Sequence, residues 1–317
     1  MRSRNALVCA LVVLAACKPS ARSSATTGPS SPGTATGDVP PIDLTNIATR
    51  SRPISAGVCG TMPCELFDSP EAAFDRVLES QPLVLGVGET HAQKDDPPVP
   101  SATKRFADTL LPRLDGKARD MVIELWVANG KCGQKTEKQV ATQQADVTKP
   151  QAATNQSEFF QLGNVAKAHN IFPQALVPNC GDYARILDAG SGDVGEMLAM
   201  IARVTGDTVL QALEKKRGMV VAYGGALHND IAPAPGREAM SFGPRLDKET
   251  HEKYVELDLI VPEFVKDNEV WKSFAWHAQY DRKLQGNKTI LFEPTPGSFI
   301  LIFPPTRDLG SAKRDGG

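Results

Sequence analysis

The sequence predicts an α/β protein with a single domain, built on a central mixed, mostly parallel sheet with helices on both faces. Three apolar runs carry this prediction: residues 83–87, residues 121–127, which are interrupted only by Glu124, and residues 219–222. Runs that do not alternate with polar residues are typical of strands buried on both faces, as in a parallel sheet. The roughly 260 residues after the N-terminal region suit one such domain better than two.

The N-terminal region predicts export and lipid anchoring. Residues 1–16 have a basic start and an apolar stretch too short to span a bilayer, which indicates a signal peptide. Residues 14–17 resemble a bacterial lipobox, so Cys17 is the expected lipidation site; ordinary signal cleavage is the alternative. Lys18 in place of Asp favours the outer membrane of a bacterial cell envelope. Residues 17–55, rich in Ser, Thr, Pro and Gly, predict a disordered tether before the domain at 56–317.

Charge and hydropathy narrow the choice of partners. The chain has 35 Lys and Arg against 37 Asp and Glu, a formal net charge of −2. Because no strongly basic field is present, nucleic acid is not an expected partner. No stretch outside the signal peptide is long and apolar enough to span a bilayer, so we expect membrane contact only through the lipid anchor.

Two helices and an exposed insertion are expected around the first two strands. Residues 69–80 read as a helix, and the Pro-rich stretch 97–100 breaks the chain after the first strand. Ser101 can then cap a helix with Phe106 and Leu110 on its apolar face, which completes a β–helix–β unit. Residues 128–156 are rich in Gln, Thr, Lys and Asn, which predicts an exposed insertion over the strand ends.

The remaining elements continue the alternation. We expect a helix at 158–169, a strand at 172–177 and helices within 193–217, before the strand that begins at residue 219. Residues 186–195 contain G-x-G-x-x-G and resemble the first motif of S-adenosylmethionine-dependent methyltransferases, although the preceding strand is poor and a glycine-containing helix entry is the simpler alternative. Three further strands are expected at 254–261, 289–292 and 298–303, with the last antiparallel at a sheet edge.

Four polar residues lie within or just after the three strands predicted from the apolar runs at 83–87, 121–127 and 219–222, which we call the motif strands. Glu89 and His91 follow the first strand, Glu124 lies inside the second and His228 follows the third. Ligands of α/β proteins collect beyond the carboxyl ends of such strands. A buried carboxylate needs compensation, so Glu124 should have a cation, a metal or hydrogen-bond donors beside it. The alternative for the first pair is a loop in which Glu89 caps a helix and His91 is solvated.

Two chemistries suit this set of four. Two imidazoles and two carboxylates suit a divalent metal such as zinc, manganese or iron, bound by Glu89, His91, Glu124 and His228. Without a metal, His91 could act as a general base oriented by a Glu. The sequence contains neither G-x-S-x-G nor H-E-x-x-H, so a serine nucleophile and a zincin mechanism find no support.

The G-E-x-H of residues 88–91, the lone Glu124 in the next strand and the G-x-x-H of residues 225–228 resemble the superfamily of erythromycin esterase, ChaN and TIKI/TraB proteins. The similarity covers most of the chain from about residue 83. It implies hydrolysis of an ester or amide in a small-molecule or peptide substrate, metal-dependent as in TIKI-like members or metal-free as in erythromycin esterases.

The ChaN-like members imply a different class of function, a non-enzymatic lipoprotein that binds haem or iron. Tyr223 and His228 lie suitably close in sequence to contact haem, although no C-x-x-C-H attachment motif is present. Asp182, at the end of the strand at 172–177, is a further candidate cofactor contact, while a turn Asp is the alternative. A degenerate, purely structural domain is a third possibility.

Four cysteines follow Cys17, an even number that suggests disulfides in an exported domain. We expect the pairs Cys59–Cys64 and Cys132–Cys180. The second pair would join two loops at the rim of the site if the strand containing Glu124 and the next strand are neighbours. A structural zinc is disfavoured, because Cys-x4-Cys has no second matching pair.

Overall fold

The computed structural model describes residues 59–190, 192–215 and 218–306. The expected signal peptide, Cys17 and most of the tether lie outside this part of the chain. The strands are β1 (Cys64–Phe67), β2 (Val84–Glu89), β3 (Ala118–Trp126), β4 (Phe172–Leu176), β5 (Met219–Gly225), β6 (Tyr254–Ile260), β7 (Thr289–Thr295) and β8 (Ser298–Ile302). The α-helices are α1 (Pro70–Leu78), α2 (Ala102–Arg105), α3 (Gln134–Thr148), α4 (Asn155–Ala168), α5 (Cys180–Ala189), α6 (Gly195–Glu214), α7 (Gly243–Glu249), α8 (Glu269–Lys272) and α9 (Arg282–Gln285).

All eight strands form one sheet in the order β1-β7-β8-β6-β2-β5-β3-β4. The six strands from β8 to β4 are parallel to one another, and β7 is antiparallel to both β1 and β8. The predicted α/β fold with a mixed, mostly parallel sheet is therefore confirmed. Because β2, β5 and β3 are adjacent, the carboxyl ends of the three motif strands lie side by side.

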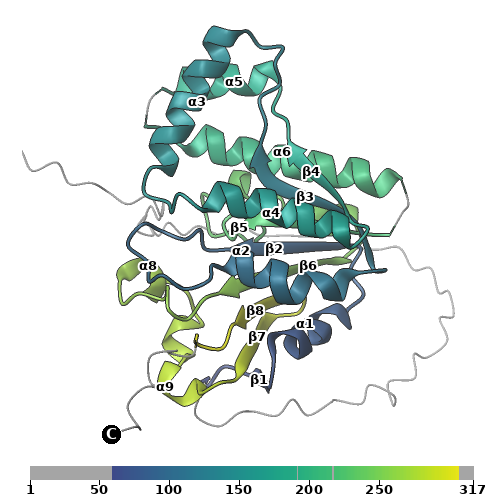
Figure 1. Ribbon diagram of the computed structural model, residues 1–317, viewed down its shortest axis with the longest axis vertical. Coiled ribbons are helices and arrows are strands. Elements are labelled where there is room, and N and C mark those ends of the chain that lie inside the picture. The colour runs from purple at the N-terminus through teal and green to yellow at the C-terminus, as the bar shows by residue number, and fades with distance from the viewer. Residues whose placement is uncertain (1–58, 191, 216–217, 307–317) are drawn as a thin grey trace, which may run out of the picture.

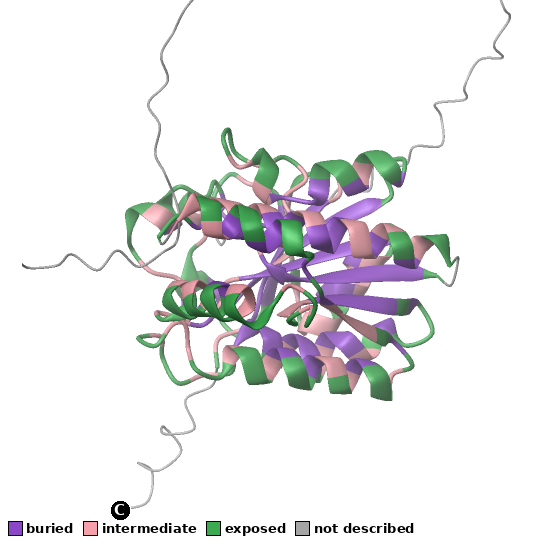
Figure 2. Ribbon diagram, turned by 90° about the horizontal axis from the view of Figure 1, so that it is seen from above, coloured by how far each residue is buried: buried purple, intermediate pink, exposed green. Residues whose placement is uncertain are grey.

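Helices cover both faces of the sheet (Figure 1). On one face α1, α2 and α4 pack on side chains of the central strands, including Leu85, Val87 and Tyr223. On the other face α5, α6 and α7 pack on the alternate residues of the same strands, including Val220 and Ala222. The strands are consequently buried between two helical layers whose outer surfaces are exposed (Figure 2). Every residue of β2 and β5 is buried, which explains their unbroken apolar sequences.

The start of the helix after β2 follows the sequence prediction. The Ser101 side chain accepts a hydrogen bond from the backbone N–H of Lys104 and caps α2. The helical path continues through a π-turn at Phe106–Leu110 and a 3₁₀ turn at Leu111–Leu114 before β3. Phe106 and Leu110 are fully buried, so this irregular helix presents the expected apolar face to the sheet.

The expectation that the last strand lies at a sheet edge is wrong. Strand β8 runs inside the sheet, parallel to β6 and antiparallel to β7, while β1 and β4 form the edges. All five residues of β8 are buried, and an interior position provides strand neighbours on both sides. The expected antiparallel pairing of the last strand is present, with β7, but β8 also pairs with β6.

Two other segments differ in detail from the sequence prediction. The stretch 128–156 is largely exposed as expected, but it contains helix α3, which packs against α5 and buries only Val140. The methyltransferase-like motif needs a strand before its glycines, and residues 186–189 instead belong to helix α5, which ends at Gly190 with a φ of 90°. The second difference arises because α5 starts soon after β4, where Asn179 caps it.

The four cysteines are paired as expected. Cys59 is joined to Cys64, with a Cα–Cα distance of 6.3 Å, and Cys132 to Cys180, with a Cα–Cα distance of 5.1 Å. The second bridge connects the segment after β3 to the start of α5 and so ties together the chain beyond two neighbouring strand ends. Across the described residues, none of the helices combines the length and the apolar character needed to cross a bilayer.

Candidate functional site

The four polar residues predicted from the motif strands meet around the carboxyl end of β5. Glu89 is the last residue of β2, and Glu124 lies two residues before the end of β3. His91 follows β2 and His228 follows β5 by three residues. We call these four residues the His–Glu site. The parallel order β2-β5-β3 brings them together, as the sequence motifs predicted.

Glu89 orients His91. The Nδ1 of His91 lies 2.5 Å from Oε1 of Glu89, so Nδ1–H donates to the carboxylate. The Glu89 side chain is 2% exposed and its other oxygen, Oε2, has no hydrogen-bond partner within the described residues. The His91 ring also packs edge-on against Phe159 of α4. These contacts fix the ring and turn its other nitrogen, Nε2, toward Gly225 and Glu124.

Glu124 lies between the two histidines. Its Oε2 accepts a hydrogen bond of 2.7 Å from the Gly225 backbone N–H. Its Oε1 is 3.8 Å from the Nε2 of His91 and 3.8 Å from the Nε2 of His228. A Cβ on Gly224 would collide with this carboxylate, so a glycine at 224 makes room for Glu124 against the sheet. The glycine pair that follows the apolar part of β5 therefore shapes the site.

His228 is held by the loop that follows β5. Its Nδ1 is 2.7 Å from the Met240 carbonyl oxygen, which can only accept, so Nδ1 carries a proton. The Ser241 hydroxyl contacts the backbone oxygens of His228 and Asp230 and closes this loop on itself. The His228 side chain is 4% exposed, and its Nε2 faces Glu124. Both imidazoles consequently direct the same nitrogen, Nε2, at one carboxylate oxygen.

The charged forms of His91 and Glu124 stabilise each other in the His–Glu site. Burial alone would lower the pKa of His91, but Glu89 and Glu124 outweigh it and hold that pKa well above its usual value. Burial alone would raise the pKa of Glu124, but the two histidines and the Gly225 N–H outweigh it and lower the pKa to about 2. The two carboxylates therefore favour the charged, imidazolium form of His91.

The donor set suits a divalent metal in kind, because imidazole and carboxylate are common ligands of zinc, manganese and iron. The Oε1 of Glu124 lies 3.8 Å from the Nε2 of each histidine, which exceeds a hydrogen bond but is a separation that two ligands of one ion can have, because metal–ligand bonds are about 2.0–2.2 Å long. Among the residues that the structure describes, the group with donor atoms all within 4.8 Å of one another is Asp230, Glu256 and Asp258, and not the His–Glu site.

The two other predicted contacts lie away from the His–Glu nitrogens. The Tyr223 hydroxyl donates to Thr103 Oγ1 at 3.2 Å inside the core, where the ring packs against Phe106 and Phe159. Asp182 is fully buried and is not the turn residue of the alternative: it lies in the first turn of α5 and completes the capping box of that helix with Asn179.

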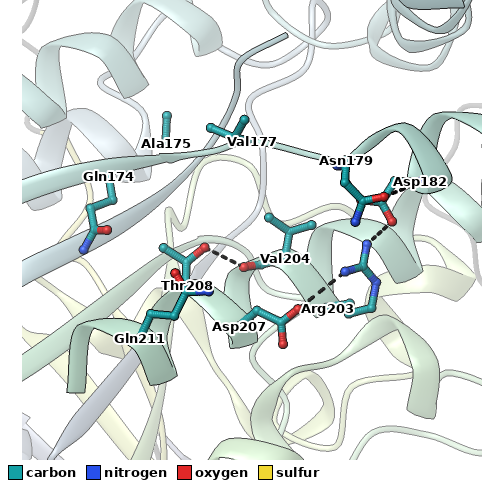
Figure 3. Close-up of a pocket in the computed structure, with 10 residues that line it drawn as sticks. All are labelled: Gln174, Ala175, Val177, Asn179, Asp182, Arg203, Val204, Asp207, Thr208 and Gln211. Carbon is teal, nitrogen blue, oxygen red and sulfur yellow. Dashed lines mark hydrogen bonds and ion pairs between the residues drawn. The ribbon is translucent and has the colours of Figure 1, made fainter. Parts of the chain in front are cut away.

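Asp182 also borders a cavity of about 320 Å³ between β4 and α6 (Figure 3). There its carboxylate binds Arg203, which in turn reaches Asp207. This cavity belongs to the outer side of the edge strand β4, and none of the four His–Glu residues lines it.

Sequence reasoning missed the residues that surround His228. Asn229 is buried beside it, and Asp230 follows. Glu256 and Asp258 were also missed, although they break the apolar run of β6 just as Glu124 breaks that of β3. Two carboxylates at alternate positions of a buried strand were a usable signal, because they must share one face of the sheet.

Comparisons with known proteins add little to this description. No protein-family model matches the chain, and no curated protein matches it. Two solved structures show a distant likeness. The type III effector HopBA1 is 8% identical with a TM-score of 0.40, and covers 77% of this chain and 98% of its own. A protein from Bacillus cereus is 9% identical with a TM-score of 0.38, and covers 76% of this chain and 94% of its own.

Proposed function

We propose that the protein is a hydrolase that cleaves an ester or amide by activating water at the His–Glu site. The observation that carries the proposal is His91, whose Nδ1 is bound by Glu89 at 2.5 Å and whose Nε2 lies 3.8 Å from Glu124 Oε1, beyond hydrogen-bond distance. An imidazole oriented through one nitrogen, with its other nitrogen free to exchange a proton, is the usual arrangement of a general base.

In this mechanism each residue has a separate task. Water attacks the substrate carbonyl carbon and gives its proton to Nε2 of His91, which later returns that proton to the leaving group. Glu89 keeps the imidazole oriented and stabilises the imidazolium that forms. Glu124 Oε1 can accept the second hydrogen of the attacking water, since it lies between the two Nε2 atoms. His228, fixed through Met240, closes the other side of the reaction space.

The metal-free form is proposed because the four donor groups do not converge as tightly as ligands of one ion. If a metal binds here, His91, Glu124 and His228 are the residues that would hold it, and it would polarise the carbonyl and acidify bound water. Activity that survives exhaustive chelation supports the metal-free form. Activity that is lost on chelation and restored by zinc or manganese contradicts it.

The decisive variant is His91→Asn, assayed with p-nitrophenyl esters and with anilides. We expect kcat/KM to fall by roughly 10² to 10⁴, the usual contribution of a general base. In the wild type kcat/KM should rise with pH above neutrality, because His91 must lose its proton and its pKa is raised. The control is His251→Asn, at an exposed histidine whose φ of 54° asparagine tolerates. Equal activity of both variants would sink the proposal.

We also propose that Cys17 anchors the chain to a bacterial envelope membrane. The support is the short apolar stretch and the lipobox-like residues 14–17, which lie outside the described residues. Mass spectrometry of the mature N-terminus should find an acylated Cys17, and Cys17→Ala should release the protein or leave it unprocessed. An unmodified terminus elsewhere would contradict the anchor.

A further inference from the structure

A second polar cluster lies on the same sheet, one strand beyond the His–Glu site. Glu256 and Asp258 alternate along β6 and therefore share one face, and Asp230 approaches them from the loop after β5. One carboxylate oxygen from each residue lies within 4.8 Å of the other two. Glu256 is 7% exposed and the other two side chains are partly exposed, so the cluster is reachable from solvent. We call it the three-carboxylate cluster.

The cluster has hydrogen bonds but, within the part of the chain that the structure describes, no ion pair with a lysine or arginine. Glu256 accepts from the Ile231 N–H at 2.7 Å and from the Ser298 hydroxyl at 3.1 Å. Asp258 accepts from the Asn229 amide at 3.1 Å. No hydrogen bond to the Asp230 carboxylate, and no ion pair with a lysine or arginine at any of the three, is found among the described residues.

Burial and repulsion between the carboxylates raise the pKa values of Asp230 and Asp258. Burial and the Glu256 carboxylate raise the pKa of Asp230 to about 7, although Arg237 opposes this. Burial and the two other carboxylates raise the pKa of Asp258 well above its usual value. Negative charge gathered here is therefore unfavourable until a proton or another cation joins it.

A separate observation points to a ligand, because Asn229 is 1% exposed and its Oδ1 has no hydrogen-bond partner within the described residues. This oxygen and Asp258 Oδ1 both lie against Gly88, where a Cβ would come within 2.4 Å of the first and 2.7 Å of the second and collide with both. Gly88 pairs with Asp258 in the sheet register. An unpartnered amide oxygen thus joins the carboxylate oxygens on one side of β2.

We propose that Asp230, Glu256 and Asp258 bind a hard divalent cation, with Asn229 Oδ1 as a further oxygen ligand. All donors are oxygens, and such sets favour Ca²⁺, Mg²⁺ or Mn²⁺ over zinc or copper. Asp230 lies two residues after His228, so a cation that ties Asp230 to β6 also steadies the loop that carries His228. The cation site itself does not depend on the proposed hydrolase activity.

The test uses purified full-length protein, stripped with EDTA and exchanged into metal-free buffer at about pH 8, above the pKa of about 7 of Asp230. Titration calorimetry with Ca²⁺, Mg²⁺ and Mn²⁺ should show one saturable site for at least one of the three. At a hundredfold excess over Kd, the thermal midpoint should rise by roughly 5–10 °C. Absence of saturable binding for all three ions overturns the proposal.

Variants locate the binding. Asp258→Asn and Asp230→Asn should each weaken the affinity at least tenfold, and Asp230→Asn is the safer variant for folding because that carboxylate is partly exposed and makes no described hydrogen bond. Asp188→Asn, at an exposed carboxylate of α5, is the matched control and should bind as wild type. His91→Asn should also bind as wild type, which separates this site from the His–Glu site. Unchanged affinity in both cluster variants overturns the proposal.

Discussion

The His–Glu site and the three-carboxylate cluster occupy the same level of one sheet but have opposite electrostatics. Gly88 pairs with Gly224 on one side and with Asp258 on the other, and Glu124 lies over Gly224. The pKa of Glu124 is lowered to about 2, whereas that of Asp258 is raised well above its usual value. Both carboxylates have the same, intermediate degree of exposure, so burial does not explain the contrast.

The difference lies in the neighbours. Glu124 faces two imidazoles and a backbone N–H, while Asp258 faces two other carboxylates and one amide. A buried carboxylate is stabilised as an anion only where donors or cations surround it. The comparison therefore predicts that removing the charge harms one region and relieves the other.

The largest expected effect separates Glu124→Gln from Asp258→Asn. Glu124→Gln leaves two histidines without their shared carboxylate and should cost on the order of 3 kcal/mol of unfolding free energy. Asp258→Asn removes repulsion and should cost nothing, or stabilise the cation-free protein. Urea unfolding in EDTA at neutral pH measures both values. Similar losses in the two variants would show that the two regions are electrostatically alike.

A smaller effect tests whether glycine makes the His–Glu site possible. An alanine methyl at 224 would overlap the Glu124 carboxylate and lie 2.9 Å from its Cβ, so Gly224→Ala should lose about 1–3 kcal/mol and hydrolytic activity. Gly163→Ala in helix α4 is the control. There the new methyl would meet its nearest neighbour at an ordinary 3.5 Å, and helix propensity should add about 0.5–1 kcal/mol. Thermal melts and activity assays of both variants decide the point.

The smallest effect is in the pH dependence of stability. The folded pKa of Asp230 is raised to about 7 from 3.8, so its contribution to stability is lost as pH rises through about 7. The folded pKa of Glu124 is lowered from 4.5 to about 2, so its contribution is present above 4.5 and lost as pH falls through about 2.

Urea unfolding between about pH 5 and pH 8 in EDTA should therefore show a steeper fall for wild type than for Asp230→Asn, by at most about 1.4 kcal/mol per pH unit. Glu124 stays ionised throughout this range and should add no slope. Parallel curves for the two proteins would refute the raised pKa of Asp230.

Much of the fold was predictable because a short stretch of sequence indicates whether its residues are buried and where a helix begins. Strands β2 and β5 are apolar without alternation because helices cover both of their faces, and Ser101 marked the start of α2 because its side chain satisfies a free N–H. The position of β8 was not predictable in this way. An apolar strand is compatible with any interior place in the sheet, and its neighbours are chosen by packing with strands distant in sequence.

The sequence by itself determined the His–Glu site, because Glu89, His91, Glu124 and His228 each interrupt or follow an apolar strand at a point where polarity needs a reason. Only the tertiary structure decided that the imidazoles share one oxygen of Glu124, that Asp182 caps a helix, and that Asp230 joins Glu256 and Asp258. The physical reason is that the pattern of neighbouring residues in the sequence indicates which positions are polar and buried. The charge state of a buried group depends instead on neighbours that the order of the strands brings close.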